Sequence, residues 1–170
     1  MAGEPTLFVI DDSFADQLKE AMERAGRLLS VRARTEHEIR DRLATAGFPE
    51  HVIEQTTARL HELGLLDDLA FARDWVRERS ARKSLGPRAL KAELYAKGIE
   101  RQVAEEALGA ENLDEESLAT EAAARWVRKV ARFPLPQQAH KLQQMLLRKG
   151  FSSEASEAGA RAALPPEGWD

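Results

Sequence analysis

The sequence contains no cysteine, and glycine, proline and aromatic residues are all scarce. Without cysteine there can be no disulfide, no thiolate catalysis and no cysteine-bound zinc or iron–sulfur cluster. The apolar run at residues 7–10 is only four residues long and is followed by Asp11 and Asp12. It is too short for a membrane span, and no basic segment precedes it as in a signal peptide. We therefore expect a cytoplasmic protein that does not enter a membrane.

The residues that are abundant favour helices. Apolar residues make up 43% and charged residues 32% of the 170 positions. Alanine, leucine, glutamate and arginine dominate, and these residues lose little free energy on entering a helix. No stretch alternates between apolar and polar residues as a half-buried strand would. The composition predicts an all-α protein.

One pattern occurs three times along the chain. It consists of two leucine or isoleucine residues four apart, a glycine four residues later, and a phenylalanine or isoleucine directly after the glycine. The three copies are Ile39-x3-Leu43-x3-Gly47-Phe48, Leu90-x3-Leu94-x3-Gly98-Ile99 and Leu142-x3-Leu146-x3-Gly150-Phe151. The glycines lie 51 and 52 residues apart, and Trp75-Val76-Arg77 recurs 51 residues later as Trp126-Val127-Arg128. The two independent marks predict tandem three-helix repeats of about 51 residues, stacked as an elongated curved array.

The glycines are explained by helix termination. A glycine in the left-handed conformation ends a helix, and the residues three before the cap and two after it then contact each other. Leu43 with Phe48, Leu94 with Ile99, and Leu146 with Phe151 have this spacing, as do Leu60 and Leu65 around Gly64. No strand followed by Gly-Lys-Ser/Thr is present, so phosphate binding by a glycine-rich loop is the poorer interpretation.

Helix starts support the same division. Thr35 and Glu38 form a predicted capping box, Asp67, Asp68 and Asp114 are N-cap candidates, and Pro49 and Pro87 fit first helical positions. The expected helices cover about 13–31, 36–46, 49–63, 68–82, 87–97, 100–108, 115–131, 137–149 and 153–163. We divide the chain into a flexible segment 1–12, a long helix 13–33, repeats 34–83 and 84–132, an incomplete repeat 133–164 and a flexible tail 165–170. The last helix offers mainly Ala155, Ala158, Ala162 and Ala163, so we expect it to be loosely held.

Candidates for catalysis are weak. The four histidines, His37, His51, His61 and His140, have no spacing typical of metal ligands. Asp67-Asp68 could bind a metal or act in acid–base chemistry, but helix capping is the simpler interpretation. Trp75 and Trp126 could stack on bases or anchor a partner, yet their repetition favours a role in the core. We expect no enzyme, no catalytic residue, no metal and no cofactor.

The charge distribution is the most informative polar feature, because the net charge of −4 hides strong banding. Residues 73–97 carry eight basic and three acidic side chains, and residues 125–149 carry seven basic and no acidic ones, whereas residues 100–121 carry eight acidic residues and one arginine. Such bands suit a polyelectrolyte or a charge-patterned protein as partner, although a solvated helix face is the alternative. The candidate binding residues are Arg73, Arg77, Arg82, Lys83, Arg88, Lys91, Arg128, Lys129, Arg132, Lys141, Arg148 and Lys149.

Several motifs between residues 34 and 99 resemble those of a known family. These are Arg34-Thr35-Glu36-His37-Glu38-Ile39, Leu66-Asp67-Asp68-x-x-Phe71-Ala72-x-x-Trp75-Val76, Gly86-Pro87 and Lys97-Gly98-Ile99. In combination they resemble the RecX family. The resemblance implies three tandem three-helix repeats and a regulator, usually an inhibitor, that lies in the groove of the RecA–DNA filament.

Three hypotheses follow. The first is a monomeric module that binds the RecA filament and limits its growth, its ATP turnover or strand exchange. The second is a helical array that binds single- or double-stranded DNA directly through its basic bands, with an affinity that falls steeply with salt. The third, and weakest, is a hydrolase whose site has no recognisable motif.

Overall fold

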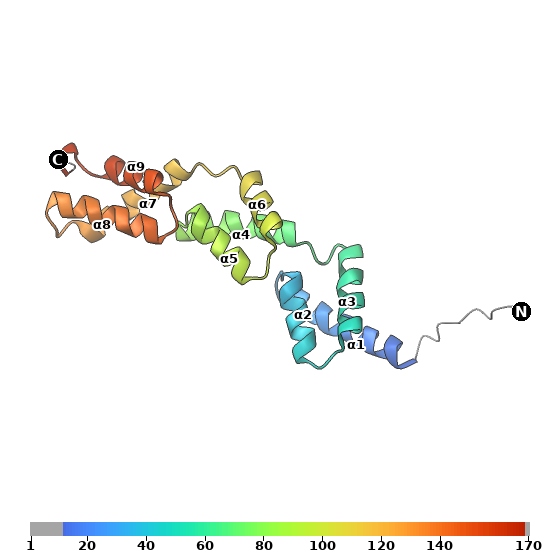
Figure 1. The fold of residues 1–170 in the computed structure, drawn as a ribbon. Helices are drawn as coiled ribbons and strands as arrows, with labels where there is room; N and C mark the ends of the chain where they lie inside the picture. Colours follow the sequence, from blue (N-terminus) through green and yellow to red (C-terminus); the bar gives the residue numbers. More distant parts are fainter. Residues whose placement is uncertain (1–11, 169–170) are drawn as a thin grey trace, which may run out of the picture. The chain divides into compact units, whose positions relative to one another are not determined.

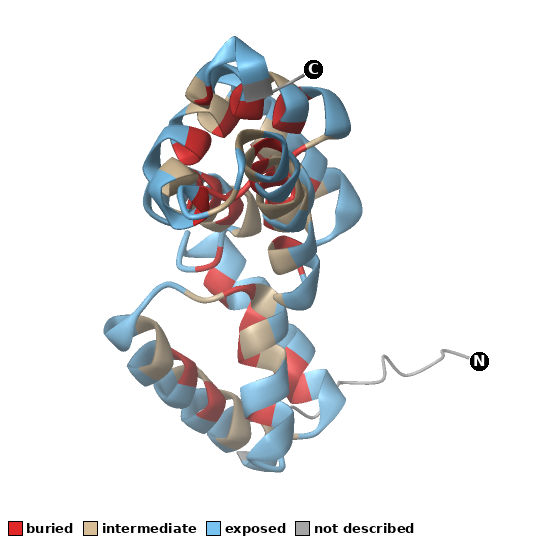
Figure 2. Ribbon diagram, turned by 90° about the vertical axis from the view of Figure 1, so that its left-hand side faces the viewer, coloured by how far each residue is buried: buried red, intermediate tan, exposed pale blue. Residues whose placement is uncertain are grey.

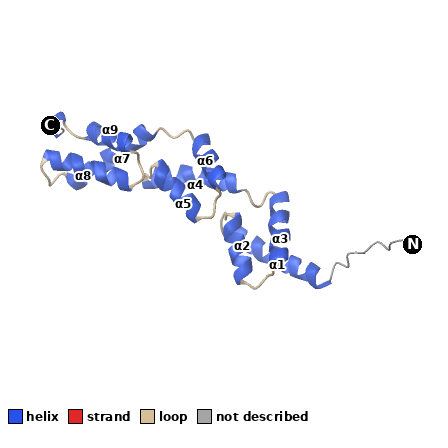
Figure 3. Ribbon diagram, in the orientation of Figure 1, coloured by secondary structure: helices blue, strands red, loops and turns tan. Residues whose placement is uncertain are grey.

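The computed structural model describes residues 12–168, and all regular structure in this range is helical (Figure 3). The predicted flexible segment 1–12 lies outside the described residues except for Asp12, with which the first helix begins. The α-helices are α1 (Asp12–Val31), α2 (Glu36–Thr45), α3 (Glu50–Glu62), α4 (Asp68–Lys83), α5 (Pro87–Ala96), α6 (Arg101–Ala110), α7 (Glu115–Val130), α8 (Leu135–Arg148) and α9 (Ser153–Ala163). The short 3₁₀ helix η1 (Pro166–Gly168) follows them. The all-α prediction is confirmed.

The chain divides into two compact units, residues 1–67 and residues 68–170. The described part of the first unit is one bundle, α1–α3 (Figure 1). Its core contains Ala21, Ala25, Ile39, Leu43, Val52, Ile53, Leu60 and Leu66, all buried. Burying each leucine, isoleucine or valine side chain contributes about 1.5–3 kcal/mol, so the bundle holds together although α2 and α3, with 10 and 13 residues, would be marginal alone.

The second unit contains two bundles, α4–α6 and α7–α9, each with its own core. Figure 2 shows the buried residues as patches on the helices, with exposed faces opposite them. The bundles are joined through backbone atoms: the Gly86 N–H donates to the Lys149 carbonyl oxygen over 2.8 Å, and the Arg88 N–H donates to that of Gly150 over 3.1 Å. A Cβ at Gly86 would lie 2.5 Å from the Gly150 backbone, so this approach requires glycine.

The repeated glycines end helices as predicted. Gly47, Gly64, Gly98 and Gly150 all have positive φ. At the first stop the Phe48 N–H donates to the Leu43 carbonyl (3.2 Å), and the Gly47 N–H donates to that of Ala44 (2.9 Å). This is the Schellman pattern of hydrogen bonds, and it recurs at each of the other three stops.

Helix starts also follow the expectation. Thr35 and Glu38 form the capping box, and the Asp114 carboxylate accepts from the Ser117 N–H over 3.1 Å. The Ser117 hydroxyl also donates to this carboxylate, over 2.6 Å, and that hydrogen bond, followed by the one from the backbone N–H, lowers the pKa of Asp114. Pro87 is the first residue of α5, whereas Pro49 is the N-cap of α3 and not its first helical residue.

The bundles group the helices differently from the predicted ranges. Those ranges place α4 with α2 and α3, and α7 with α5 and α6. In the structure α1 completes the first bundle, and α4 and α7 each open a new one. The repeat period of about 51 residues stays the same, because all the predicted repeat boundaries are displaced by one helix in the same direction. Which three helices form a bundle is shown by the side chains that share a core: Ala21 and Ala25 of α1 pack with Ile39 and Leu43 of α2.

The expectation of a loosely held last helix is wrong. Ala155, Ser156, Gly159 and Ala160 of α9 are buried against α7, whereas Ala162 is exposed and Ala158 only half-buried. A Cβ on Gly159 would lie 2.8 Å from the Ala119 carbonyl carbon. Small side chains thus let two backbones approach closely, and that packing replaces bulky anchors.

The described part of the predicted tail is also structured. Leu164 is buried in the third core, and η1 packs against α8. Residues 169 and 170 lie outside the described range.

Candidate binding surface

A basic hollow lies where the C-terminal ends of α4 and α8 meet α7. Its volume is about 560 Å³. Its cationic lining residues are Arg82, Lys83, Arg125, Lys129, Arg148 and Lys149, and its other lining residues are Ser84, Leu85, Trp126 and Met145. No carboxylate lines it. The hollow therefore suits an anion.

Local sequence explains why these cations gather. Arg82 and Lys83 occupy the last turn of α4, Lys129 the last turn of α7, and Arg148 the last turn of α8. Cations at helix C-termini are stabilised by the helix dipole, by about 0.3–1 kcal/mol each. The hollow thus brings together positive charges from the last turns of three helices, each of which its own helix accommodates.

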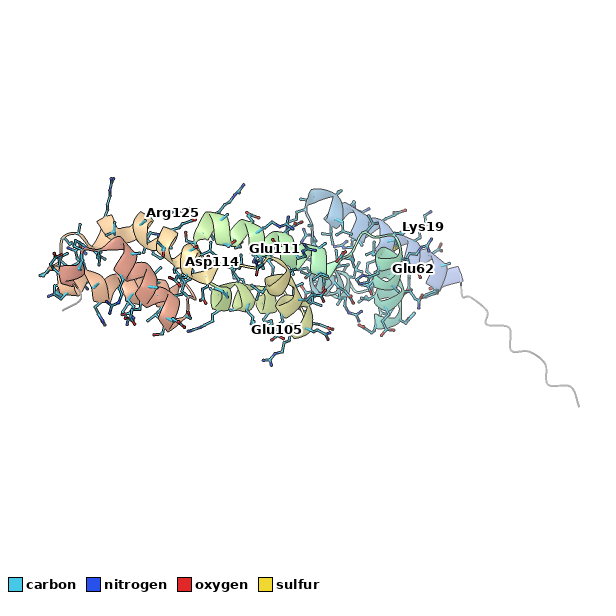
Figure 4. The ribbon with its side chains drawn as sticks, turned by 90° about the horizontal axis from the view of Figure 1, so that it is seen from above. Lys19, Glu62, Glu105, Glu111, Asp114 and Arg125 are labelled. Atoms are coloured by element: carbon cyan, nitrogen blue, oxygen red, sulfur yellow. The ribbon has the colours of Figure 1, made fainter. Side chains whose placement is uncertain are left out.

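Residue Ser84 connects two walls of the hollow. It follows α4 with φ of 50°, a left-handed value that is uncommon outside glycine. The Arg125 guanidinium of α7 (labelled in Figure 4) donates to Ser84 Oγ over 3.1 Å and to the Ala81 carbonyl oxygen over 3.5 Å. Arg125 thereby links α7 to the end of α4.

A second basic hollow adjoins the first. It has a volume of about 360 Å³, is lined by Arg132, Phe133, His140 and Lys141 among others, and shares Lys129, Met145 and Arg148 with the first hollow. The Lys141 ammonium lies 4.3 Å and the Arg132 guanidinium 4.9 Å from the Phe133 ring centroid. These distances are typical of cation–π contacts.

We call the cations of both hollows together the basic surface. They are Arg82, Lys83, Arg125, Lys129, Arg132, Lys141, Arg148 and Lys149. Within the described residues, the ion pairs of this set join Arg82 to Glu78 (3.5 Å) and Arg125 to Glu121 (3.6 Å) along the same helices. Exposed pairs of this kind contribute little and are readily exchanged. The surface is therefore a concentrated positive charge with few counter-charges.

Arg73 and Arg77, which the sequence proposes as binding residues, lie elsewhere. Both contact Glu111 at the end of α6 (Figure 4), at 3.2 Å and 2.9 Å. The Glu111 side chain is only 11% exposed. The hydrogen bond from Arg77, followed by that from Arg73, lowers the pKa of Glu111, and the same contact raises the pKa of Arg77. These arginines fasten α4 to α6.

The other proposed residues divide as follows. Arg88 and Lys91 of α5 line a separate hollow of about 290 Å³ with Glu105, to which Lys91 is paired over 3.5 Å. Arg128 is exposed on α7 but lines neither basic hollow. Seven of the twelve proposed residues thus share the basic surface: Arg82, Lys83, Lys129, Arg132, Lys141, Arg148 and Lys149. The sequence proposal omitted Arg125, although its spacing of four from Lys129 places both on one helix face.

The histidines and the acidic pair have local contacts. His61 Nε2 lies 2.7 Å from Glu36, His51 stacks on Phe14, and His140 lines the second hollow. Asp67 directly precedes α4, and Asp68 is its first residue. Among the described residues, no three His, Asp or Glu side chains gather as a metal site. No helix in residues 12–168 combines the length and apolarity that a membrane crossing requires.

Comparison with known proteins identifies three family domains along the chain. Residues 21–60, 67–108 and 114–157 match the first, second and third three-helix domains of RecX. The chain is 35% identical over 155 residues to the regulatory protein RecX of Levilactobacillus brevis, covering 90% of this chain and 58% of that relative's length. It is 33% identical over 156 residues to that of Streptomyces lividans, covering 91% of this chain and 83% of the relative.

Two solved structures of RecX proteins have a similar fold. The crystal structure of RecX from Lactobacillus salivarius matches with a TM-score of 0.81 and 26% identity, over 88% of this chain and 97% of that one. A second crystal structure of regulatory protein RecX matches with a TM-score of 0.79 and 30% identity, over 92% of this chain and 80% of that one. The three consecutive domains and the coverage of the relatives show that the chain belongs to the RecX family of regulatory proteins.

Proposed function

We propose that this protein inhibits RecA recombinase by binding the RecA–DNA filament in its groove, where it limits filament growth, ATP turnover and strand exchange. It acts in the cytoplasm as a monomer and is not an enzyme. Two observations support the proposal: membership of a family of regulatory proteins, and a basic surface on the second unit that no carboxylate lines. The basic surface is the observation that carries it.

The chemistry of the surface fits a filament. A RecA–DNA filament offers repeated phosphates, and guanidinium and ammonium groups bind phosphates and carboxylates through charge-assisted hydrogen bonds. The cations lie on or directly after three helices of one compact unit, so the backbone positions that carry them are fixed before binding. Preorganised contacts lose less entropy when they bind.

The first experiment measures the DNA-dependent ATPase of the cognate RecA with substoichiometric amounts of this protein. We expect turnover to fall, because one bound molecule blocks addition of further subunits to a filament. Turnover that does not change at equimolar protein would reject filament inhibition.

A charge-reversal variant locates the contact. Replacing Lys129, Arg132 and Arg148 by Glu should weaken inhibition by at least about tenfold while helical content is unchanged. The matched control replaces Lys19, Arg24 and Arg27 of α1, which alters the net charge equally. If both variants inhibit alike, the basic surface has no special part in the mechanism.

A second variant replaces Arg128, Lys129 and Arg132 by Glu, three consecutive cations among the candidate binding residues proposed from the sequence. Because Arg128 lines neither hollow, we expect Arg128→Glu alone to have a smaller effect than Lys129→Glu alone.

The second candidate is direct DNA binding without a recombinase, which the acid-free lining favours independently. The two candidates differ in their salt dependence. For a single strand, the logarithm of affinity falls with the logarithm of salt concentration with a slope of about −0.7 per phosphate neutralised. Tight, steeply salt-dependent DNA binding together with unchanged RecA turnover would favour this alternative.

A further inference from the structure

Trp75 and Trp126 occupy equivalent places in the second and third bundles. Each lies on the first helix of its bundle, α4 or α7. In both bundles the lysine that caps the second helix lies over the indole ring: Lys97 at 4.4 Å and Lys149 at 5.9 Å from the centroid. The repeat has thus produced two versions of one tryptophan–lysine contact, which can be compared.

In the second bundle, neighbouring side chains occupy both the N–H and the ring of Trp75. The indole N–H donates to Glu93 Oε2 over 2.8 Å. The Arg79 guanidinium lies 4.1 Å from the ring centroid and also pairs with Glu93 at 3.4 Å, and the Phe71 ring stacks at 5.8 Å. One carboxylate therefore satisfies the indole and neutralises a nearby cation, which leaves little for a ligand to contact.

The Trp126 version is open. Leu90 and Leu94 of α5 correspond to Leu142 and Leu146 of α8 at an offset of 52 residues, and the same offset aligns Glu93 with Met145. The carboxylate that closes the first version is therefore replaced by a thioether. Within residues 12–168 the Trp126 indole N–H makes no hydrogen bond, and it is not among the buried unpartnered atoms, so it remains accessible to a ligand.

The lysine and arginine side chains that surround Trp126 have no carboxylate partner across the hollow. Lys129 and Lys149 lie 5.8 Å and 5.9 Å from its ring centroid, and Arg148 and Lys83 line the same hollow. An accessible donor, an aromatic face and several cations thus converge in about 560 Å³, a volume within the range of small-ligand sites.

These features select one class of ligand. The carboxylates of an acidic protein segment would pair with the cations but leave the indole face unused. In duplex DNA the base faces are already stacked, so only phosphates would contact the hollow. An unpaired nucleotide uses both, because its base stacks on an aromatic ring and its phosphate pairs with Lys and Arg.

We propose that the Trp126 hollow binds one nucleotide of a single-stranded nucleic acid, with the base on the indole and the phosphate among Lys129, Arg148 and Lys149. The site goes beyond filament regulation, because it requires no recombinase. Met145 stands where Glu93 closes the Trp75 version, and Val130 and Ala122 stand where Arg79 and Phe71 contact it.

The test restores the missing carboxylate. Met145→Glu places at the third bundle the group that closes the second, whereas Met145→Gln has nearly the same shape without the charge. Gln137→Glu, on an exposed part of α8, controls for net charge. Binding to short oligothymidylate is measured by anisotropy, without RecA, together with far-UV circular dichroism. We expect Met145→Glu to weaken binding at least about tenfold, and both controls to stay within about threefold of wild type.

Quenching of tryptophan fluorescence by added oligothymidylate provides a second readout, which reports contact between a base and the indole ring. In a Trp75→Phe, Trp169→Phe background, oligothymidylate should quench Trp126 emission on saturation, and a hairpin duplex should quench it far less. Equal binding by Met145→Glu and wild type, or saturation without quenching, would overturn the site. So would polyglutamate that binds more tightly than oligothymidylate, since that result indicates an acidic protein partner.

The recombinase assay separates this proposal from the previous one. If Met145→Glu loses oligothymidylate binding but still suppresses RecA ATPase, the nucleotide site stands and the filament contact lies elsewhere. If wild type binds and quenches as expected but leaves RecA turnover unchanged, filament inhibition fails and the nucleotide site remains.

Discussion

Replacing Gly159 of α9 by alanine should destabilise the second unit, although the same replacement stabilises most exposed helices. In a helix interior, Gly→Ala contributes about 1 kcal/mol through backbone entropy. At Gly159 the new Cβ would lie 2.8 Å and 2.9 Å from the Ala119 carbonyl carbon and oxygen, and 3.1 Å from its Cβ. The first two are backbone atoms of α7, so they cannot move without shifting the helix.

Forcing a methyl group into packed structure costs about 1–3 kcal/mol. Set against the gain of about 1 kcal/mol, the net effect is a loss between about zero and 2 kcal/mol. Gly109→Ala is the matched control, because Gly109 is helical, exposed and in the same unit, and a Cβ there meets nothing within 4 Å. We expect that control to gain about 0.5–1 kcal/mol.

The two variants are compared by thermal unfolding followed by circular dichroism. For a unit of this size, 1 kcal/mol corresponds to a shift of about 4–8 °C in Tm. We expect Gly109→Ala to melt above wild type and Gly159→Ala to melt at or below it. A Gly159→Ala protein that gains as much as Gly109→Ala would refute the close approach of α7 and α9.

Three further predictions concern the ion pair, the cap and the helix stop. The contacts with Arg77 hold the pKa of Glu111 below its ordinary value of 4.5, so their stabilisation is present above about pH 4.5 and is lost as pH falls through the lowered pKa. Glu111→Gln should therefore lower Tm at pH 7, and the difference from wild type should shrink in melts below pH 4.5; a constant difference would contradict the ion pair. Thr35→Ala should cost about 1 kcal/mol in urea denaturation, through loss of the capping box, whereas an unchanged midpoint would speak against it. Gly98→Val should cost about 2 kcal/mol because φ is +74° there, and a variant that melts with wild type would disprove the strain.

The helices and their ends could be predicted from the sequence because their signals are local. Leu43, Gly47 and Phe48 lie within six residues, and their spacing alone specifies the hydrogen bonds of the stop. Grouping the helices into bundles was less predictable. A period of about 51 residues is the same wherever counting starts, and the phase depends on which long-range contacts form. The burial of Ala21 and Ala25 decides it, and small residues give only a weak apolar signal.

The candidate site was only partly predictable for a similar reason. Helical spacing identified the cations, but not which of them have a counter-charge across the bundle. Arg77 and Lys129 look alike in the sequence, yet Arg77 pairs with Glu111, 34 residues away, and Lys129 lines a hollow without carboxylates. Likewise, Arg125 of α7 contacts Ser84, 41 residues away, just after the end of α4, and no local pattern in the sequence indicates that contact.

A repeat protein offers an internal comparison that a single domain does not. Bundles two and three retain the tryptophan, the capping lysine and the stop glycine, so the backbone that holds them is under the same constraint in both. What differs is the set of side chains around the indole. Glu93, Arg79 and Phe71 of the second bundle align with Met145, Val130 and Ala122 of the third, and neither Glu93 nor Met145 is fully buried. In the second bundle this carboxylate satisfies an indole and a guanidinium, and in the third bundle the indole is retained but the guanidinium is not. Its absence from the third bundle, in a segment of 25 residues that carries seven cations and no acid, is what the proposed nucleotide site requires, because a carboxylate beside Trp126 would repel the phosphate that the cations attract.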